Sequence, residues 1–472
     1  MSKIAFFCIP AHGHTNPTLA VIEELNRRGH QVRYYTTEQF REKVETAGAK
    51  FVSIDLDEGK QMPPSAGAKV ATDLKFAANL IVDTTLAIDQ WICREMASYK
   101  PDIIVADSMA YWGKLIAQKL NIPYMCSTTT FAFNQYSARV MKQGPGNMLQ
   151  MLGDMPAINR SLQKLRDKGY HCRGILDIIS NDNYTNTIVY TSPEFQPCAE
   201  SFSRHYHFVG PLLRPAVSQV HKEPDKNLIY ISLGTVNNAM LDFYRNCLTA
   251  LGNDPRYQVI MSVGCQVDIQ SLGQLPANFQ VAPNVDQVAV LQAADVFLTH
   301  CGMNSASEGL YCGVPLLLYP LTKEQQGVAN RISQLGAGIM LKDSQPAAIR
   351  AGVEQLLAQS GFREQAAVLA ASFRCCGGAE EAADAIEKTA AEPPEKCWGK
   401  KPPAIWTAAL IGQCVTGIIA LILLALAIFS QDNRLIFLIS GAVLGTVSNI
   451  IKLVDTRKQK QKMAVRKKEL MK

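Results

Sequence analysis

The stretch His300–Pro315, reading HCGMNSASEGLYCGVP, determines the fold that we expect for this chain. The apolar run Asp295–Thr299 precedes it and predicts a buried strand, after which a His-x-Gly turn leads into a helix opening at Asn304. The first backbone N–H groups of a helix lack partners within it and carry partial positive charge, so this arrangement predicts a phosphate site. Since His300 can add a donor and Glu308 can accept from a sugar hydroxyl, the segment indicates a nucleotide diphosphate as ligand.

The composition excludes several classes of protein. At 472 residues the chain is long enough for two or three domains. Its 13 cysteines are scattered, often inside apolar runs, which is typical of reduced thiols in a cytosolic protein. The net charge of +6 comes from residues 452–472, which carry +7, so residues 1–451 carry −1. A nearly neutral body with a basic tail does not indicate a nucleic-acid binder.

Apolar runs alternate with longer amphipathic stretches through residues 1–390, which predicts an α/β fold of βαβ units on parallel sheets. Residues 213–226 lie in a proline-containing run without periodicity and are expected to form a linker. We therefore predict two doubly wound, Rossmann-like lobes that face a cleft, an N-terminal acceptor-binding lobe at 1–212 and a C-terminal donor-binding lobe at 227–390. Ligands of such sheets bind beyond the carboxyl ends of the strands.

The pattern changes after residue 390. A proline-rich connector, 391–403, leads to the uncharged segment Ala404–Phe429, a short polar turn and a second apolar segment, Leu435–Ile451. These segments predict a transmembrane hairpin over 404–451, although the second could also be a re-entrant or interfacial helix. Basic residues flank both ends of the hairpin, so we expect a multi-pass protein of the cell membrane with its body and both termini cytoplasmic. The basic tail, 452–472, either lies on anionic headgroups or acts only as a topology signal.

Two residues of the first lobe are candidates for acid–base chemistry. The motif Pro10–Pro17, PAHGHTNP, follows the first predicted strand and places His14 at the sheet edge that faces the cleft. Histidine suits a general base near neutral pH if another group orients it. Asp107 ends another strand at the same edge and is the candidate for that role. The alternatives are a structural histidine and an aspartate that caps the helix beginning near Met109.

The second lobe offers further polar groups. Ser232-Leu233-Gly234-Thr235 ends a strand with a glycine turn and could form a second phosphate cradle. Glu324 and Gln325 follow the next strand after the His300 segment and could bind sugar hydroxyls, or Glu324 could simply stabilise a helix N-terminus. Asp55-Leu56-Asp57 is similar to a metal-binding DxD motif, but it is far from the phosphate features, so we expect no metal site.

The segment Asn284–Gln325 resembles the donor-binding signature of the inverting, GT-B-fold glycosyltransferases that use UDP-sugars. The segment Gly13–Pro17 is similar to the N-terminal motif of the macrolide type within that family, and Tyr230–Thr235 to the start of the family's second lobe. The resemblance covers about residues 1–390. It departs from the family at Asn284, where many members have an aromatic residue that stacks on uracil, so the nucleotide base stays open.

The resemblance implies a role for each matching residue. His14 would be the catalytic base and Asp107 its orienting partner. His300, Asn304 and Ser305 would hold the diphosphate, Glu308 the ribose, and Glu324 and Gln325 the donor sugar. The donor-binding residues that it implies are Ser232, Gly234, Thr235, Val285, Gln287, His300, Gly302, Asn304, Ser305, Glu308, Glu324 and Gln325. Such enzymes need no metal or cofactor besides the UDP-sugar co-substrate, because helix dipole and imidazole stabilise the leaving UDP.

The resulting hypothesis is a membrane-tethered hexosyltransferase that moves glucose from UDP to a hydroxyl of a lipophilic acceptor with inversion. Trp112, Phe131 and Phe133 are candidates for the acceptor pocket, although aromatic residues at such positions also serve as core. The acceptor could be a macrolide-like or flavonoid-like compound, or a membrane lipid or sterol. The alternative from another class is a non-catalytic nucleotide-sugar-binding scaffold or sensor at the membrane.

Overall fold

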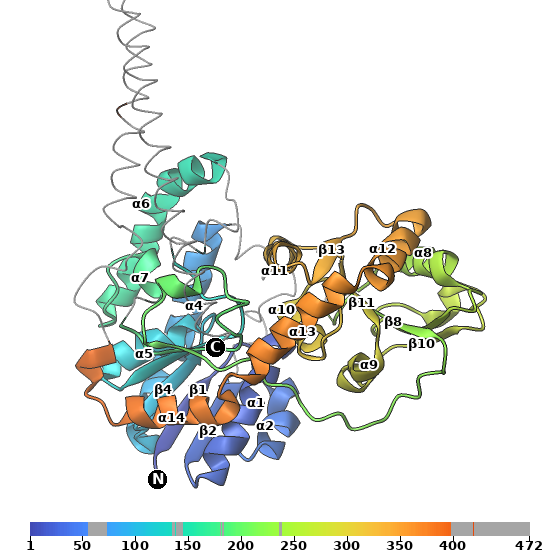
Figure 1. The fold of residues 1–472 in the computed structure, drawn as a ribbon. Coiled ribbons are helices and arrows are strands. Elements are labelled where there is room, and N and C mark those ends of the chain that lie inside the picture. The colour runs from blue at the N-terminus through green and yellow to red at the C-terminus, as the bar shows by residue number, and fades with distance from the viewer. Residues whose placement is uncertain are drawn as a thin grey trace, which may run out of the picture.

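The computed structural model describes residues 1–54, 73–134, 137, 145–179, 181, 184–235, 238–397 and 419. Figure 1 shows two lobes side by side, each formed by a parallel sheet with helices on its faces. This architecture confirms the predicted α/β class with two Rossmann-like lobes. Between the last strand of the first sheet and the first strand of the second, no helix or strand is formed over the predicted linker, 213–226.

The first lobe is built on a seven-stranded sheet with the order β3-β2-β1-β4-β5-β6-β7. Its strands are β1 (Lys3–Phe7), β2 (Gln31–Thr36), β3 (Lys50–Ser53), β4 (Ile103–Asp107), β5 (Tyr124–Thr128), β6 (Thr187–Val189) and β7 (Tyr206–Phe208). Its helices include α1 (His12–Arg27), α2 (Arg41–Thr46), α4 (Leu74–Tyr99), α5 (Tyr111–Leu120), α6 (Pro145–Asp167) and α7 (Ile175–Ile179).

The second lobe has a six-stranded sheet with the order β10-β9-β8-β11-β12-β13. Its strands are β8 (Asn227–Ser232), β9 (Tyr257–Ser262), β10 (Phe279–Ala282), β11 (Val296–Thr299), β12 (Leu316–Leu318) and β13 (Gly338–Met340). The helices that follow in sequence are α8 (Leu241–Leu251), α9 (Gln287–Ala293), α10 (Met303–Tyr311), α11 (Lys323–Gln334), α12 (Pro346–Ala358), α13 (Ser360–Arg374) and α14 (Gly378–Ala390).

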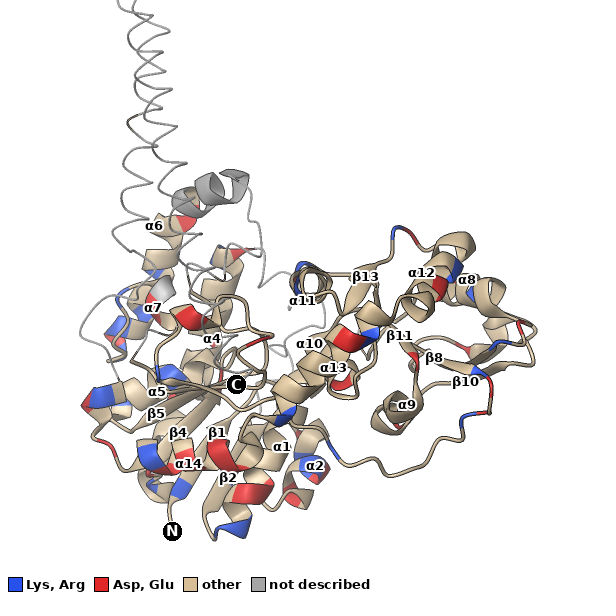
Figure 2. Ribbon diagram, viewed as in Figure 1, with Lys and Arg blue, Asp and Glu red and all other residues tan. Residues whose placement is uncertain are grey.

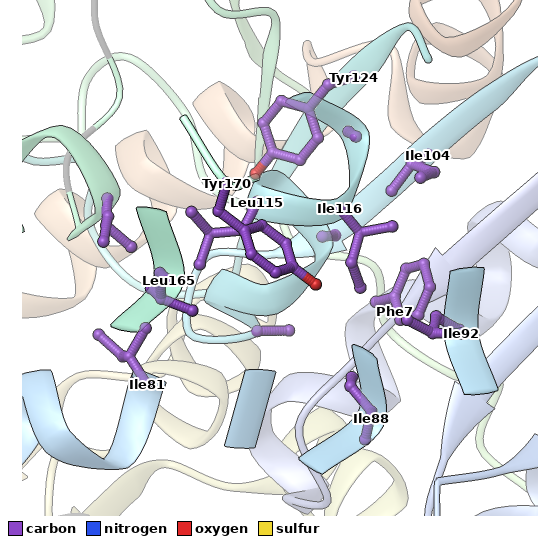
Figure 3. Close-up of a cluster of buried hydrophobic side chains, with 14 of the residues drawn as sticks. Phe7, Ile81, Ile88, Ile92, Ile104, Leu115, Ile116, Tyr124, Leu165 and Tyr170 are labelled. Carbon is purple, nitrogen blue, oxygen red and sulfur yellow. The ribbon is translucent and has the colours of Figure 1, made fainter. Parts of the chain in front are cut away.

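The strands form because their runs of apolar residues can be buried on both faces of a parallel sheet. β4 and β5 are buried at every position. Figure 3 shows how one face of the first sheet is covered: Phe7 of β1 and Ile104 of β4 lie in one cluster with Ile88 of α4 and Leu115 of α5. Burial of this kind holds the strand ends rigidly, and the strand ends carry the site.

The chain order reverses once in each sheet. In the first sheet β1 pairs with both β2 and β4, and in the second β8 pairs with both β9 and β11. The loops that follow two such strands leave toward opposite faces of the sheet and open a space at its carboxyl edge, where ligands of doubly wound folds bind. The loops after β1 and β4 carry the first-lobe candidates, and those after β8 and β11 carry the second-lobe candidates.

Helix α14 follows the second sheet in sequence but packs on the first lobe (Figure 1). Its Ala383 and Ile386 are fully buried in a core cluster together with Ile22 of α1. Arg28 at the end of α1 donates to Asp384 at 2.6 Å. Residues 378–390, the end of the predicted second lobe, thus pack on the first lobe, since an amphipathic pattern does not say which lobe its apolar face will cover.

Within the described residues, no helix combines the length and the apolar character that crossing a membrane requires. This finding contradicts the predicted multi-pass location in the cell membrane. Apart from Ile419, the predicted hairpin, 404–451, lies outside the described residues, as do the predicted basic tail, 452–472, and the Asp55-Leu56-Asp57 motif.

Candidate active site

His14 and Asp107 meet where the first sheet reverses its order. His14 lies in the first turn of α1, which follows β1, and Asp107 is the last residue of the neighbouring strand β4. His14 Nδ1 is 2.8 Å from Asp107 Oδ2. The Asp107 side chain is completely buried, and its other oxygen accepts from the backbone N–H of Met109 at 2.9 Å. The aspartate therefore caps the local turn and also orients the histidine, two roles that were alternatives on sequence grounds.

The surroundings of His14 favour its protonated form. Burial by itself lowers the pKa of His14, but the Asp107 charge and hydrogen bond outweigh it, and Glu324 adds to their effect, so the pKa is raised above its ordinary value. When Nδ1–H donates to Asp107, the neutral ring keeps its lone pair on Nε2, as a base requires. Thr129 Oγ1 lies 3.1 Å from the same Nδ1, a contact that sequence analysis missed because Thr129 belongs to no recognisable motif.

His300 is enclosed between two glycines of the second lobe. A Cβ at Gly234 would lie 2.5 Å from His300 Cε1, and a Cβ at Gly302 would lie 2.5 Å from His300 Nε2. Gly234 also has a φ of +76°, which side chains rarely adopt. Burial, opposed by a backbone hydrogen bond at Ser232, lowers the pKa of His300 to about 4, and within the described structure its Nδ1 is buried without a hydrogen-bond partner. The imidazole is therefore neutral near pH 7 and can donate one N–H to a phosphate.

The glycine turn after β8 is held in shape by its own side chains. Ser232 Oγ accepts from the N–H of Gly234 at 3.3 Å, and Thr235 is exposed. Asn238, which sequence analysis did not select, is buried and donates from Nδ2 to the carbonyl of Gly234 at 2.8 Å. A Cβ at Gly264 would overlap the Asn238 amide, so Gly264 makes room for it. A buried asparagine in the run SLGTVNNAM gave no pattern from which this contact could be predicted.

The first turns of α10 carry three predicted donor-binding residues. Asn304 Nδ2 donates to the carbonyl of Gly13 at 3.0 Å, so its amide joins the two lobes in this structure. Gln287 Nε2 donates to Ser305 Oγ at 3.3 Å and also to Glu308, and Tyr230 donates to Gln287 Oε1 at 3.1 Å. Burial raises the pKa of Glu308, against the opposing effects of Gln287 and Arg214. Glu308 and Gln287 thus form one polar network on the second lobe.

The residues before α9 lie at the edge of this network. Val285 is partly buried against the core of the second lobe, while Asn284 is exposed and its Nδ2 lies 3.4 Å from Cys265 Sγ. Asp286 caps α9 and also accepts from the backbone N–H groups of Val217 and Ser218 at 2.7 and 2.9 Å. Asp286 therefore fastens the linker to the loop that carries Asn284, a role that its position in the motif did not indicate.

Glu324 and Gln325 begin α11 but have different surroundings. Gln325 Oε1 accepts from the N–H groups of Leu321 and Thr322 at 2.8 and 3.1 Å, which completes a capping box. The carbonyl oxygen of the Gln325 amide, the group predicted to hold the sugar, is therefore engaged in the helix cap. Glu324 is exposed, and its charge acts on His14 of the other lobe. The structure thus brings Glu324, rather than Gln325, into the electrostatic field of the dyad.

The three aromatic residues predicted to line an acceptor pocket have different surroundings. Phe131 lies 5.2 Å from Phe195, ring centre to ring centre, in a cluster with core residues of the second lobe. Trp112 packs against the core of the first lobe, and Phe133 is 44% exposed. An acceptor pocket lined by these residues stays a prediction, because apolar patterns do not distinguish a pocket wall from a core.

Comparisons with known proteins agree with this geometry. The family described as "Glycosyltransferase family 28 N-terminal domain" matches residues 4–140, and "Erythromycin biosynthesis protein CIII-like, C-terminal domain" matches residues 256–388. The NDP-glycosyltransferase YjiC of Bacillus subtilis (strain 168) is 32% identical over 398 residues, which cover 81% of this chain and 96% of that protein. The uncharacterized UDP-glucosyltransferase YojK of the same strain is 30% identical over 397 residues, which cover 82% of this chain and 97% of that protein.

A solved structure leads to the same conclusion. The calicheamicin glycosyltransferase CalG4 matches with a TM-score of 0.70 at 28% identity, covering 82% of this chain and 98% of that one. This chain thus shares both lobes, and their order along the sequence, with known glycosyltransferases. The chain belongs to the macrolide-type glycosyltransferases of the GT-B fold, enzymes that move a sugar from a nucleoside-diphosphate donor to a small-molecule acceptor.

Proposed function

We propose that this enzyme transfers a hexose, glucose in the first instance, from UDP to a hydroxyl group of a lipophilic small molecule, with inversion at the anomeric carbon. The observation that carries the proposal is the contact of 2.8 Å between His14 Nδ1 and Asp107 Oδ2, at the point where the first sheet reverses its order. A carboxylate that orients a histidine in this way leaves Nε2 as a base for an incoming hydroxyl.

The reaction is a single displacement. The acceptor oxygen attacks the anomeric carbon on the face opposite the diphosphate while its proton passes to His14 Nε2. The bond between that carbon and the diphosphate oxygen breaks, and its electron pair leaves with UDP. Asp107 stabilises the imidazolium that forms, since it already raises the pKa of His14. One displacement at one carbon inverts its configuration.

The leaving group is assigned to the second lobe. The N-terminus of α10 supplies partial positive charge, and neutral His300 supplies a hydrogen-bond donor to the developing negative charge. We propose that these groups stabilise UDP without a metal ion or a further cofactor. Glu308, with one oxygen held by Gln287, is assigned to the ribose hydroxyls, and Glu324 to the donor sugar.

Glucose and uridine are supported by the relative described as a UDP-glucosyltransferase. At Asn284 an exposed amide stands where many members of the family have an aromatic ring that stacks on uracil, so the screen below varies the nucleotide base. A small-molecule acceptor is supported by the calicheamicin glycosyltransferase among the structural relatives. A non-catalytic scaffold does not account for a histidine–aspartate pair in a chain that belongs to this enzyme family.

A donor and acceptor screen tests the proposal. Glucose and galactose donors carrying UDP, dTDP or GDP are offered with phenolic and macrolide acceptors and, separately, with a lipid extract, and release of the nucleotide is measured. We expect release from UDP-glucose with a phenolic or macrolide acceptor, and a β-linked product from the α-linked donor. Release from dTDP or GDP donors alone would contradict the uridine assignment, product from lipids alone would contradict the acceptor class, and an α-linked product would contradict inversion.

A further inference from the structure

Three nitrogen-bearing side chains from three separate segments converge beside the His14 turn. His12 comes from α1, Lys43 from α2 and Arg214 from the linker, and we call them the basic cluster. Lys43 Nζ donates to His12 Nδ1 at 3.2 Å, and both Lys43 Nζ and Arg214 Nη2 donate to Asn16 Oδ1, at 3.4 and 2.9 Å. Figure 2 shows basic residues on α2 and along the linker that joins the lobes.

Among the described residues, no carboxylate forms an ion pair with Lys43 or Arg214, although the charge of Arg214 acts on Glu308. After burial, the causes that lower the pKa of His12 are the charges of Lys43 and Arg214, and the cause that lowers the pKa of Lys43 is Arg214. The two cations thus share one neutral amide oxygen. Two acidic residues of this part of the chain, Glu38 and Glu45, are paired with Arg41.

The basic cluster borders the place where the second lobe offers its phosphate site. His12 precedes Gly13, whose carbonyl accepts from Asn304 in the first turn of α10. The charge of Arg214 acts on Glu308, one turn further along the same helix. In addition, α1 begins at His12 with no acidic residue in its first turn and no side-chain cap. Two helix N-termini and two cations therefore surround one region between the lobes.

We propose that the basic cluster binds the diphosphate of the nucleotide-sugar donor from the first-lobe side, opposite the half-site formed by α10 and His300. This inference rests on the proposed function, because it assumes a nucleoside-diphosphate donor. An anion between two cations and a helix N-terminus gains charge-assisted hydrogen bonds and relieves the repulsion between Lys43 and Arg214. Because the cluster joins the first lobe and the linker, its contacts also favour the arrangement in which both lobes surround the donor.

The test compares Arg214→Ala and Lys43→Ala with the control variant Arg41→Ala. Arg41 lies on the same short helix as Lys43, but its charge is already offset by Glu38 and Glu45. Calorimetry gives the Kd of the nucleoside diphosphate that the wild-type enzyme binds most tightly among UDP, dTDP and GDP. The corresponding nucleoside and inorganic pyrophosphate are measured in parallel. Thermal unfolding of each variant shows whether it is folded.

We expect each cluster variant to weaken binding of the nucleoside diphosphate about tenfold, the loss that one charge-assisted hydrogen bond typically represents. Binding of the nucleoside should change less than twofold, and affinity in the cluster variants should fall less steeply with added salt. Unchanged diphosphate affinity in folded variants would overturn the inference, as would an equal loss of nucleoside affinity. Weakened pyrophosphate binding without any effect on the nucleoside diphosphate would indicate a separate anion site and would also overturn it.

The outcome is independent of the proposed reaction. Nucleotide binding is measured without an acceptor, so the inference can hold even if no sugar transfer is found in the screen. Conversely, transfer to a phenolic acceptor with normal nucleotide affinity in Arg214→Ala and Lys43→Ala would support the proposed function and reject the basic cluster as part of the donor site.

Discussion

Replacing Asp107 with asparagine keeps the shape of the dyad and removes its charge. Asp107 Oδ1 accepts from the N–H of Met109 at 2.9 Å, so the asparagine oxygen should stay on that side. Its NH₂ group then faces His14 Nδ1, which must accept instead of donate. The imidazole proton moves to Nε2, the atom that the reaction needs unprotonated.

The size of the effect follows from the bond that is lost. A hydrogen bond to a charged group contributes about 1.5–3 kcal/mol, and about 1.36 kcal/mol corresponds to tenfold in rate. We therefore expect Asp107→Asn to lower kcat about 10- to 150-fold from this contact alone. Nucleotide affinity should stay within twofold, because the groups of the second lobe that bind phosphate are untouched.

The pH profile supplies a second, independent readout. In the wild-type enzyme Asp107 raises the pKa of His14 against the effect of burial. A base acts when unprotonated, so wild-type activity is lost as the pH falls through this raised pKa. Without the Asp107 charge, burial lowers the pKa of His14, so the acidic limb of the profile moves to lower pH while the maximum rate falls. Steady-state kinetics from pH 5 to 9 measure both quantities.

Asp102→Asn is the matched control, since Asp102 immediately precedes the first residue of β4, at the end of the strand opposite Asp107, and accepts from the N–H of Lys3 at 2.7 Å. It should leave both the rate and the profile unchanged. The reasoning would be refuted if Asp107→Asn kept the wild-type kcat, or if its acidic limb stayed in place or moved to higher pH.

Three further predictions follow from the structure. Gly234→Ala should weaken UDP binding and lower the free energy of unfolding by about 1–3 kcal/mol, through the clash with His300 and the positive φ. The control Gly313→Ala, with a φ of +74° and nothing within 4 Å of its Cβ, should lower stability without affecting UDP binding. Calorimetry measures the UDP affinity of both variants and urea unfolding their stability. The pKa of His300 in the ligand-free enzyme is about 4, and a bound diphosphate should raise it, so the affinity for UDP-glucose should increase as the pH falls from 7 to 5. If the pH dependence of affinity is lost in His300→Gln, this supports the assignment, and if it is unchanged, this rejects it. Ile386→Ala, in the fully buried face of α14, should lower the free energy of unfolding in urea by about 2–5 kcal/mol. A loss no larger than that of Val368→Ala, whose side chain is 53% exposed, would contradict the packing of α14 on the first lobe.

Features that depend on local pattern could be predicted from the sequence. The segment around His300 combines a buried strand, a glycine turn and a helix start within a few residues, so its geometry follows from the chain itself. His14 and Asp107 could be paired because His14 follows one strand and Asp107 ends another, and the carboxyl ends of these strands share one sheet edge. The alternation of strands and helices likewise predicted two doubly wound lobes.

Features that depend on which surfaces meet could not be predicted in the same way. The pattern of α14 predicts an amphipathic helix, but not that Ile386 covers the first lobe. Phe131 is apolar in a core and in a pocket alike, and only the structure places it against Phe195. Gln325 is an exception, because the Thr-x-x-Gln spacing from Thr322 already indicates a capping box that engages its amide.

The central claim is that His14 is the base that removes the acceptor proton, and the variant His14→Ala tests it most directly. Its rate of sugar transfer and its affinity for UDP are measured side by side, with His171→Ala, an exposed histidine of the first lobe, as control. We predict that transfer falls about 10²- to 10⁴-fold while UDP affinity stays within twofold of the wild-type value. Transfer at a rate close to wild type, or a loss of UDP affinity that accounts for the whole decrease, would contradict the assignment.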